Sequence, residues 1–290
     1  MKNLISVNII GGLGNHLFKI AAILYYIKNE NNKEKREIVF KNEDIIYDVN
    51  NMKRKTFWNT LFKDKFRLIE PSEYFSNNFI KIYEYRDHIH QEFNYNINNN
   101  IILNGHFQSF KYINDNIHKK MINYIYSNAD LMLKAYNEYN KIKLYFGNNT
   151  EDNDIVSLHI RRTDYITLNN YYYNLEKDYY SEALNIANKK YIVVFSDDIE
   201  WCKENINNSW FNYDKIFFVN IENENNVEIE FILMSLFQHN IIANSTFSLW
   251  ASFISTYQKP KIVIAPKKWY GINGPKNWEE LYHKKITNII

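Results

Sequence analysis

Residues 157–165 read Ser-Leu-His-Ile-Arg-Arg-Thr-Asp-Tyr, and this stretch decides the fold of the chain. It continues an apolar run from Ile155 that has the length and the β-branched content of a buried strand. The sequence then turns polar at once, so the strand should end where the charges of Arg161 and Arg162 begin. Open α/β sheets bind ligands outside the carboxyl ends of their strands. The stretch therefore predicts an α/β fold with a charged site at a strand end.

The two adjacent arginines have two interpretations. Guanidinium forks match phosphate oxygens bidentately and keep their charge at any working pH, which suits a pyrophosphate ligand. Alternatively, Arg161 or Arg162 simply pairs with Asp164 in a surface cluster, and such pairs are common and contribute little. On these residues alone both interpretations stay open.

The second half of the chain alternates strands with helices. Strands are expected at 155–160, 191–195, 215–219, 240–243 and 261–265, with helices at 179–189, through 201–202, at 227–237 and from 248. This alternation predicts a parallel, doubly wound sheet. Polar motifs follow the strands, so a nucleotide pocket is expected where these residues converge at one sheet edge: His159, Arg161, Asp197, Asn244 and Ser245.

The first half opens with a β-loop-α pattern. A strand is expected at 4–10, a glycine-rich turn at 11–15 and a helix at 17–27, and Leu17 stands where a dinucleotide fingerprint has its third glycine. A strand at 101–103 places His106 and Gln108 at another strand end. Residues 111–145 read as helical, and the polar patch at 147–154 predicts a domain boundary near residue 150.

Composition limits the classes of partner and compartment. The 290 residues carry a net charge of +2, which does not support whole-protein attraction to nucleic acid or membrane. The single cysteine, Cys202, excludes an internal disulfide framework and favours a reducing compartment, with the cytoplasm as the default. No apolar run reaches the roughly 18 residues of a transmembrane helix, which predicts a soluble or peripherally membrane-attached protein.

Five motifs together resemble glycosyltransferase family 11, the α1,2-fucosyltransferases. The stretch at 159–164 is similar to the His-x-Arg-Arg-x-Asp motif of inverting fucosyltransferases. The other four recur in that family in the same order and lie at 11–18, 105–109, 195–198 and 243–248. Five motifs in the right order, spread over most of the chain, are hard to explain by chance.

This resemblance implies a GT-B fold, with two Rossmann-like domains facing across a cleft. Residues 1–150 would form the acceptor-side domain and residues 151–290 the donor domain, whose last helix could pack back on the first. The implied substrates are GDP-L-fucose and a glycan with a galactose-type hydroxyl group, joined in an α1,2 linkage with inversion and without a metal or other cofactor. The implied donor-binding residues are His159, Arg161, Arg162, Asp197, Asp198, Asn244, Ser245, Thr246 and Ser248, and those on the acceptor side are Gly12, Gly14, Asn15, His16, His106 and Gln108.

The resemblance identifies the catalytic residues less directly than the binding residues. Arg161, with the backbone amides at the helix start near 245, would stabilise the departing diphosphate, although capping is the ordinary use of a serine there. Related α1,6-fucosyltransferases have a glutamate where this chain has Asn169, so Asp164 is named as the base, with an ion pair to Arg162 as its structural alternative. Asp197 and Asp198 are expected to bind guanine or ribose, or to cap a helix, rather than to hold Mg²⁺.

Two departures from the family pattern concern the acceptor. His106 stands where an aromatic tyrosine is common, and His16 where glutamine is usual. A transferase for another nucleotide deoxy-sugar is the alternative within the class. Two alternatives lie outside the class of transferases. One is a carbohydrate-binding or single-stranded nucleic-acid-binding module, and the other is a protein that binds a sugar nucleotide without catalysis. The sequence makes no prediction of oligomeric state.

Overall fold

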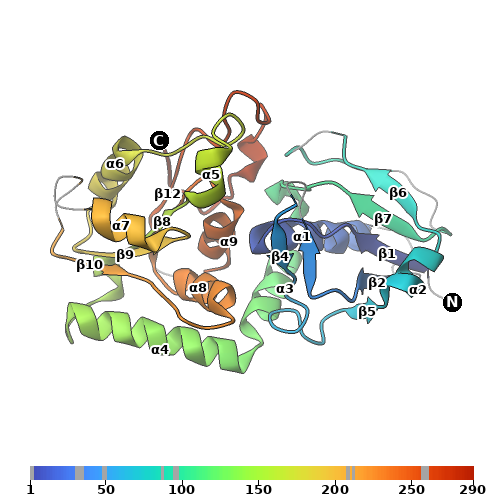
Figure 1. Ribbon diagram of the computed structural model, residues 1–290, viewed down its shortest axis with the longest axis horizontal. Helices are drawn as coiled ribbons and strands as arrows, with labels where there is room; N and C mark the ends of the chain where they lie inside the picture. Colours follow the sequence, from blue (N-terminus) through green and yellow to red (C-terminus); the bar gives the residue numbers. More distant parts are fainter. Residues whose placement is uncertain are drawn as a thin grey trace. The chain divides into compact units, whose positions relative to one another are not determined.

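The computed structural model describes residues 3–29, 36–47, 51–85, 88–93, 98–206, 210, 213–255 and 261–290. The chain forms two compact units, which are considered one at a time (Figure 1). The first comprises Met1–Asn128 with Asn277–Tyr282, and the second Ala129–Lys276 with His283–Ile290. Each contains a parallel sheet with helices, which confirms the predicted α/β class of two Rossmann-like units.

The first unit is built on a five-stranded parallel sheet in the order β5-β2-β1-β7-β6. Its strands are β1 (Asn3–Val7), β2 (Arg36–Lys41), β5 (Arg67–Ile69), β6 (Ile80–Tyr83) and β7 (Ile101–Asn104), and β3 (Ile45–Tyr47) pairs antiparallel with β4 (Lys53–Lys55). Its helices are α1 (Leu13–Asn29), α2 (Pro71–Ser76), α3 (Asp115–Tyr126) and the 3-10 turns η2 (Phe110–Tyr112) and η4 (Glu279–Leu281).

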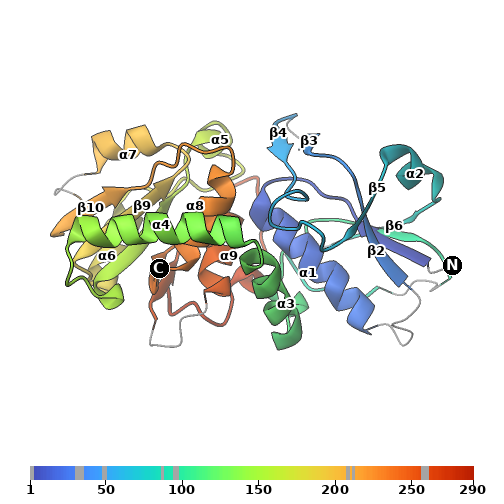
Figure 2. The same ribbon diagram turned by 90° about the horizontal axis from the view of Figure 1, so that it is seen from below.

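Alternation along the strands gives this sheet two buried faces. Leu4, Val39 and Ile69 pack with Tyr74 of α2, and the Tyr74 hydroxyl group donates to Ser6 Oγ at 2.9 Å. Helix α1 runs along the other side of the sheet (Figure 2). Both faces are thus covered, as a parallel sheet requires.

The second unit contains a six-stranded sheet in the order β10-β9-β8-β11-β12-β13. Its strands are β8 (Ile155–Ile160), β9 (Tyr191–Ser196), β10 (Lys215–Phe218), β11 (His239–Ile241), β12 (Val263–Ala265) and β13 (Asn288–Ile289). Its helices are α4 (Ala129–Phe146), α5 (Thr163–Thr167), α6 (Lys177–Ala187), α7 (Ile199–Asn205), α8 (Asn226–Ser235), α9 (Thr246–Ile254) and the 3-10 turn η3 (Asp152–Asp154).

Strand β8 lies in the middle of this sheet and is buried throughout. Val156, Leu158 and Ile160 pack in one cluster with residues of α6 and α7. Ser157 and His159 alternate with them and so point to the opposite face. The parallel register pairs Ile160 with Ser196, so the chain leaves β8 and β9 at the same edge.

The boundary between the units differs from the predicted one. The first unit ends at Asn128 rather than near residue 150, because α4 belongs with the second unit. Tyr139 packs its ring 5.2 Å from that of Phe237, and its hydroxyl group donates to Asp152 at 2.5 Å. The predicted return of a last helix to the first unit is replaced by the short segment Asn277–Tyr282, after which the chain rejoins the second unit.

Helix starts also differ from the predictions. Helix α1 begins at Leu13 rather than Leu17, because the carbonyl of Gly12 already accepts from the amides of Asn15 and His16. The predicted helix over residues 111–145 is divided into α3 and α4. Among the described residues, no helix combines the length and the apolar character needed to span a bilayer.

Candidate functional site

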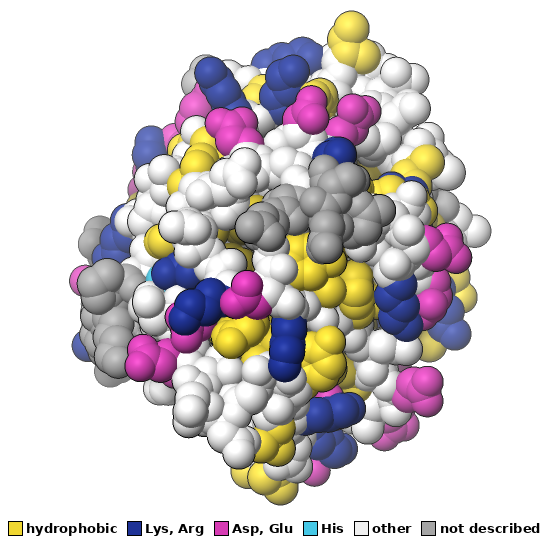
Figure 3. All heavy atoms as spheres, turned by 90° about the vertical axis from the view of Figure 1, so that its left-hand side faces the viewer, with side chains coloured by type: hydrophobic (Ala, Val, Ile, Leu, Met, Phe, Trp, Pro, Cys, Tyr) yellow, Lys and Arg dark blue, Asp and Glu magenta, His cyan; other side chains and the backbone are white. Residues whose placement is uncertain are grey.

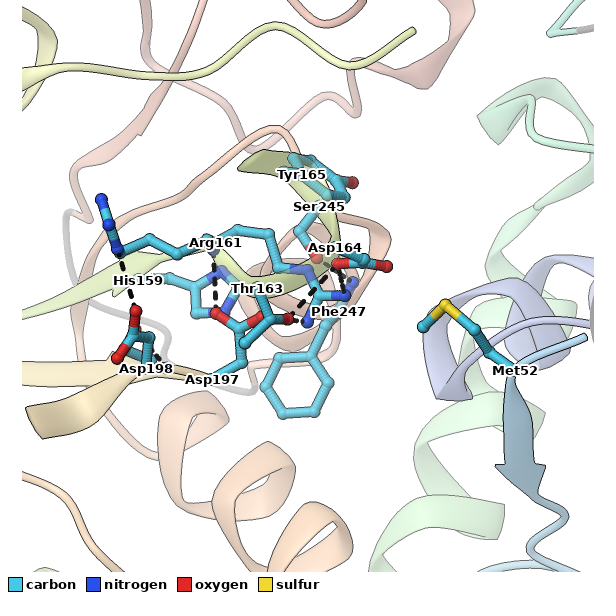
Figure 4. Close-up of polar contacts among 12 residues, drawn as sticks. Met52, His159, Arg161, Thr163, Asp164, Tyr165, Asp197, Asp198, Ser245 and Phe247 are labelled. Atoms are coloured by element: carbon cyan, nitrogen blue, oxygen red, sulfur yellow. Dashed lines mark hydrogen bonds and ion pairs between the residues drawn. The ribbon is translucent and has the colours of Figure 1, made fainter. Parts of the chain in front are cut away.

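Polar residues that follow β8 and β9 meet at the carboxyl edge of the second sheet (Figure 4). Arg161 and Arg162 follow β8, and Asp197 and Asp198 follow β9. Because the two strands are parallel and adjacent, the two pairs are neighbours although 35 positions separate Arg162 from Asp197. Of the five residues predicted to converge at this edge, Arg161 and Asp197 are in direct contact.

Arg161 is held by two carboxylates. Its Nη1 lies 2.7 Å from Asp197 Oδ2, and its Nη2 pairs with Asp164. Its guanidinium carbon lies 5.2 Å from the centroid of the Tyr165 ring. Burial acts to lower the pKa of Arg161, but Asp197, Tyr165 and Asp164 together raise it above its ordinary value. With 20% of its side chain exposed, this fixed cation stays within reach of a ligand.

Arg162 has different partners. Its Nε lies 3.2 Å from Asp198 Oδ2, and its guanidinium stacks 3.5 Å from the centroid of the Trp201 ring. Its backbone amide donates to Asp197 Oδ1 at 2.9 Å. The predicted structural ion pair between Arg162 and Asp164 is therefore wrong, because Asp164 pairs with Arg161 instead.

His159 is a buried member of β8. Its Nδ1 lies 2.9 Å from Ser248 Oγ, which connects the strand to α9. Burial lowers the pKa of His159 to about 4, Arg161 acts in the same direction, and Asp197 opposes both. The imidazole is therefore neutral at pH 7, and the interaction with Ser248 sets its orientation.

The start of α9 uses its hydroxyl groups for local structure. Ser245 is the N-cap, and its Oγ accepts from the amide of Phe247 at 3.4 Å. Ser248 Oγ lies 3.3 Å from the Ser245 carbonyl as well as near His159. Thr246 is the first residue of the helix. Capping, the ordinary use of a serine here, is thus confirmed for Ser245.

Asn244 has a different environment from the predicted one. Its side-chain Nδ2 donates to the carbonyls of Tyr173 and Trp269, both at 2.7 Å, and the residue is 1% exposed. Its own carbonyl accepts from the Tyr165 hydroxyl group at 3.0 Å. Asn244 was predicted to bind the nucleotide-sugar donor, and in the structure both hydrogens of its side-chain amide are instead engaged by two other chain segments. We call these segments, residues 168–173 and 269–274, the paired loop.

The acceptor-side residues lie in the first unit, and part of them converge there. Gln108 Nε2 donates to Asn15 Oδ1 at 2.8 Å, which brings two predicted motifs together. The backbone amide of His106 donates to Glu84 Oε2 at 2.5 Å. Gly12 is exposed, whereas Gly14 is buried in the first turn of α1.

His16 departs from the expected cleft position. It is 0% exposed, and its ring packs edge-on against Phe57 with centroids 5.4 Å apart. Burial lowers its pKa to about 3, with Lys19 acting in the same direction. We therefore reassign His16 to the core of the first unit.

The acidic residues of the site are already engaged by cations and donors. Asp197 contacts Arg161 and the Thr163 hydroxyl group, while Asp198 contacts Arg162 and accepts from the amide of Trp201 at 3.4 Å. The predicted helix-capping role of Asp198 is thus confirmed for α7. Within the described residues, no group of three or more His, Cys, Asp or Glu side chains is arranged to hold a metal ion.

Sequence reasoning missed two contributors to this region. Thr163 and Trp201 complete the environment of the two arginines. Of these two, only Thr163 had a signal in the sequence, namely its position inside the motif. A third residue that the sequence reasoning did not single out, Glu230, lies on α8 of the same unit. Burial raises the pKa of Glu230 to about 7, a property that its place in an apolar run could have suggested.

Comparisons with known proteins agree on one family. The family described as Glycosyl transferase family 11 matches residues 1–289. The O-antigen biosynthesis glycosyltransferase WbnK of Escherichia coli is 28% identical over 299 residues, covering 91% of this chain and 94% of that protein. An α-1,2-colitosyltransferase of Escherichia coli is 34% identical over 128 residues, or 40% of this chain and 41% of that protein. Galactoside α-(1,2)-fucosyltransferase 2 of Bos taurus is 30% identical over 115 residues, or 37% and 33%.

Proposed function

Because the chain belongs to glycosyl transferase family 11, we propose that it transfers L-fucose from GDP-L-fucose to a galactose-type hydroxyl group of a glycan. The chain is a glycosyltransferase, and the proposal adds the donor, the acceptor, an α1,2 linkage formed with inversion, and independence of metals. The resemblance of the five motifs supports it, as does the relative named galactoside α-(1,2)-fucosyltransferase 2.

One observation carries the donor site. Arg161 is fixed at a strand end by Asp197 and Asp164, yet 20% of its side chain is exposed. The ion pairs of Arg161 and of Arg162 are joined by the hydrogen bond from the Arg162 amide to Asp197, so the two cations are held in place rather than forming a bare cationic patch. The oxygens of a diphosphate would accept hydrogen bonds from the remaining N–H groups of Arg161 and from first-turn amides of α9.

In the proposed reaction the acceptor hydroxyl oxygen attacks the anomeric carbon from the face opposite the diphosphate. The bond between that carbon and the phosphate oxygen breaks, and GDP departs with its charge stabilised by Arg161. The diphosphate binds the N–H groups of Arg161 that Asp164 and Asp197 leave available, and the Asp164 carboxylate accepts the proton of the acceptor hydroxyl group. Asp164 is thus the proposed base.

A calorimetric titration with GDP tests the donor site, with UDP as the control nucleotide and EDTA present throughout. Arg161→Ala is expected to weaken GDP binding by about tenfold to a hundredfold, since hydrogen bonds to charged groups contribute about 1.5–3 kcal/mol. Arg67→Ala is the matched control, because Arg67 is also held by two carboxylates, Glu37 and Glu73. Absence of GDP binding by folded wild-type protein, or equal binding of UDP, would overturn the proposal.

A different donor sugar is the second candidate, because one relative is named an α-1,2-colitosyltransferase. Mass spectrometry of the product after incubation with nucleotide-activated fucose and colitose in equal amounts distinguishes the two sugars.

We also propose a cytoplasmic location, supported by the single cysteine, Cys202, which is free and buried.

The nucleic-acid-binding alternative gains no support from the charges. On the face drawn in Figure 3 the described Lys and Arg side chains alternate with Asp and Glu, and neither sign forms a continuous field. Nucleic-acid-binding surfaces instead gather positive charge along one face.

A further inference from the structure

The paired loop has an unusually close-fitting backbone. The amide of Gly271 donates to the carbonyl of Tyr171, and that of Asn273 to the carbonyl of Asn170, both at 2.8 Å. A Cβ atom at Gly271 would lie 2.6 Å from the Asn170 carbonyl oxygen, and one at Gly274 would lie 2.5 Å from that of Tyr171. The two segments therefore require glycine at these positions and are held in one geometry.

A series of rings connects the paired loop to the donor site. The guanidinium of Arg161 lies over Tyr165, and the rings of Tyr165 and Tyr172 are stacked with centroids 4.0 Å apart and planes at 4°. Tyr172 in turn stacks on Tyr270 at 6.0 Å, and Tyr171 packs edge-on against both. The loop is thus continuous with the site through side-chain contacts.

The paired loop also exposes apolar side chains next to polar ones. Tyr171 is 39% exposed and Ile272 is 77% exposed, and the neighbouring Asn273 is exposed as well. Two such side chains cannot provide the roughly 800 Å² per partner that a stable protein interface buries. A sugar ring matches this surface better, because it has an apolar C–H face and a rim of hydroxyl groups. Aromatic faces attract polarised C–H groups, and amides bind hydroxyl groups.

We propose that the paired loop, through Tyr171 and Ile272, binds a sugar ring of the acceptor glycan next to the donor site. This inference rests on the proposed function and specifies its acceptor subsite. It assigns the binding of the acceptor in part to the second unit, whereas the sequence motifs indicated only the first.

The test measures the affinity for lactose, a β-galactosyl disaccharide, in the presence of saturating GDP. Tyr171→Ala is expected to weaken lactose binding about tenfold, equivalent to about 1.4 kcal/mol. Tyr171→Phe and Tyr136→Ala are expected to change it less than twofold. Tyr136 is the matched control because it is an exposed tyrosine of the same unit, located on α4. GDP affinity is expected to be the same in all four proteins.

The outcomes separate this inference from the proposed function. A wild-type protein that does not bind GDP would contradict the proposed function itself. Normal GDP binding with equal lactose affinity in wild type and Tyr171→Ala contradicts the subsite alone, as does wild-type protein that binds GDP but no lactose. Self-association in sedimentation experiments that only Tyr171→Ala abolishes would instead identify an interface between copies of the chain, and would also overturn the inference.

Discussion

Replacement of Asn244 by alanine tests whether this residue binds the donor or holds the paired loop. The substitution removes the side-chain donor to the carbonyls of Tyr173 and Trp269, of which the Trp269 carbonyl still accepts from the amide of Tyr173 at 3.4 Å. An unsatisfied buried acceptor costs about 1–3 kcal/mol, so Asn244→Ala should lower the free energy of unfolding by about 1–3 kcal/mol. GDP affinity of the folded protein should change less than threefold, because the amide faces the loop.

Urea unfolding followed by circular dichroism measures the stability, and a urea slope of about 3 kcal/mol/M for a chain of this size predicts a midpoint lower by about 0.3–1 M. Hydrogen exchange locates the effect, since the amides of Gly271 and Asn273 hold the two segments together and should lose protection. Calorimetry gives the GDP affinity. Unchanged unfolding with tenfold weaker GDP binding would refute this reasoning and restore Asn244 as a donor-binding residue.

Three further predictions concern buried groups and the paired loop. Burial raises the pKa of Glu230 from 4.5 to about 7, so the folded protein retains a proton that the unfolded chain releases as the pH rises through this window. Glu230→Gln should therefore raise the free energy of unfolding by about 3 kcal/mol more at pH 8 than at pH 4, and equal effects at both would contradict it. Burial lowers the pKa of His159 from 6.5 to about 4, so its contribution is present above pH 6.5 and is lost as the pH falls toward 4. Urea titrations should show a shallower loss of stability across this range in His159→Gln than in wild type, whereas parallel curves would argue against the shift. Gly271→Ala should weaken lactose binding at least fivefold with normal GDP binding, because its Cβ meets the Asn170 carbonyl, and unaltered lactose affinity would show that the loop can adjust.

Local sequence signals predicted the parts of the fold that depend on neighbours in the chain. Strand β8 is observed at its predicted bounds, because a β-branched run there is followed directly by charges. The division near residue 150 was wrong because the polar segment at 147–154 resembles a linker. What assigns α4 to the second unit is its packing near Phe237, more than 90 positions away from Tyr139.

In the candidate site, too, contacts between residues far apart in the chain could not be predicted from local sequence. Placing Arg161 near Asp197 required only the rule that parallel strands end together. The role of Asn244 could not be read from the sequence, since its partners Tyr173 and Trp269 are 71 and 25 positions away. Burial of His16 likewise depends on Phe57, which the pattern of residues 30–100 did not place.

The register between β8 and β9 also determines which evolutionary changes this protein can accept. Substitutions in the segments after the strands alter single contacts, such as that of Trp201 with Arg162. A one-residue insertion or deletion inside β8 would instead reverse every following side chain, turning His159 away from Ser248. It would also displace Arg161 from Asp197. In functional relatives, alignment gaps should therefore accumulate in the connecting segments and be excluded from these two strands.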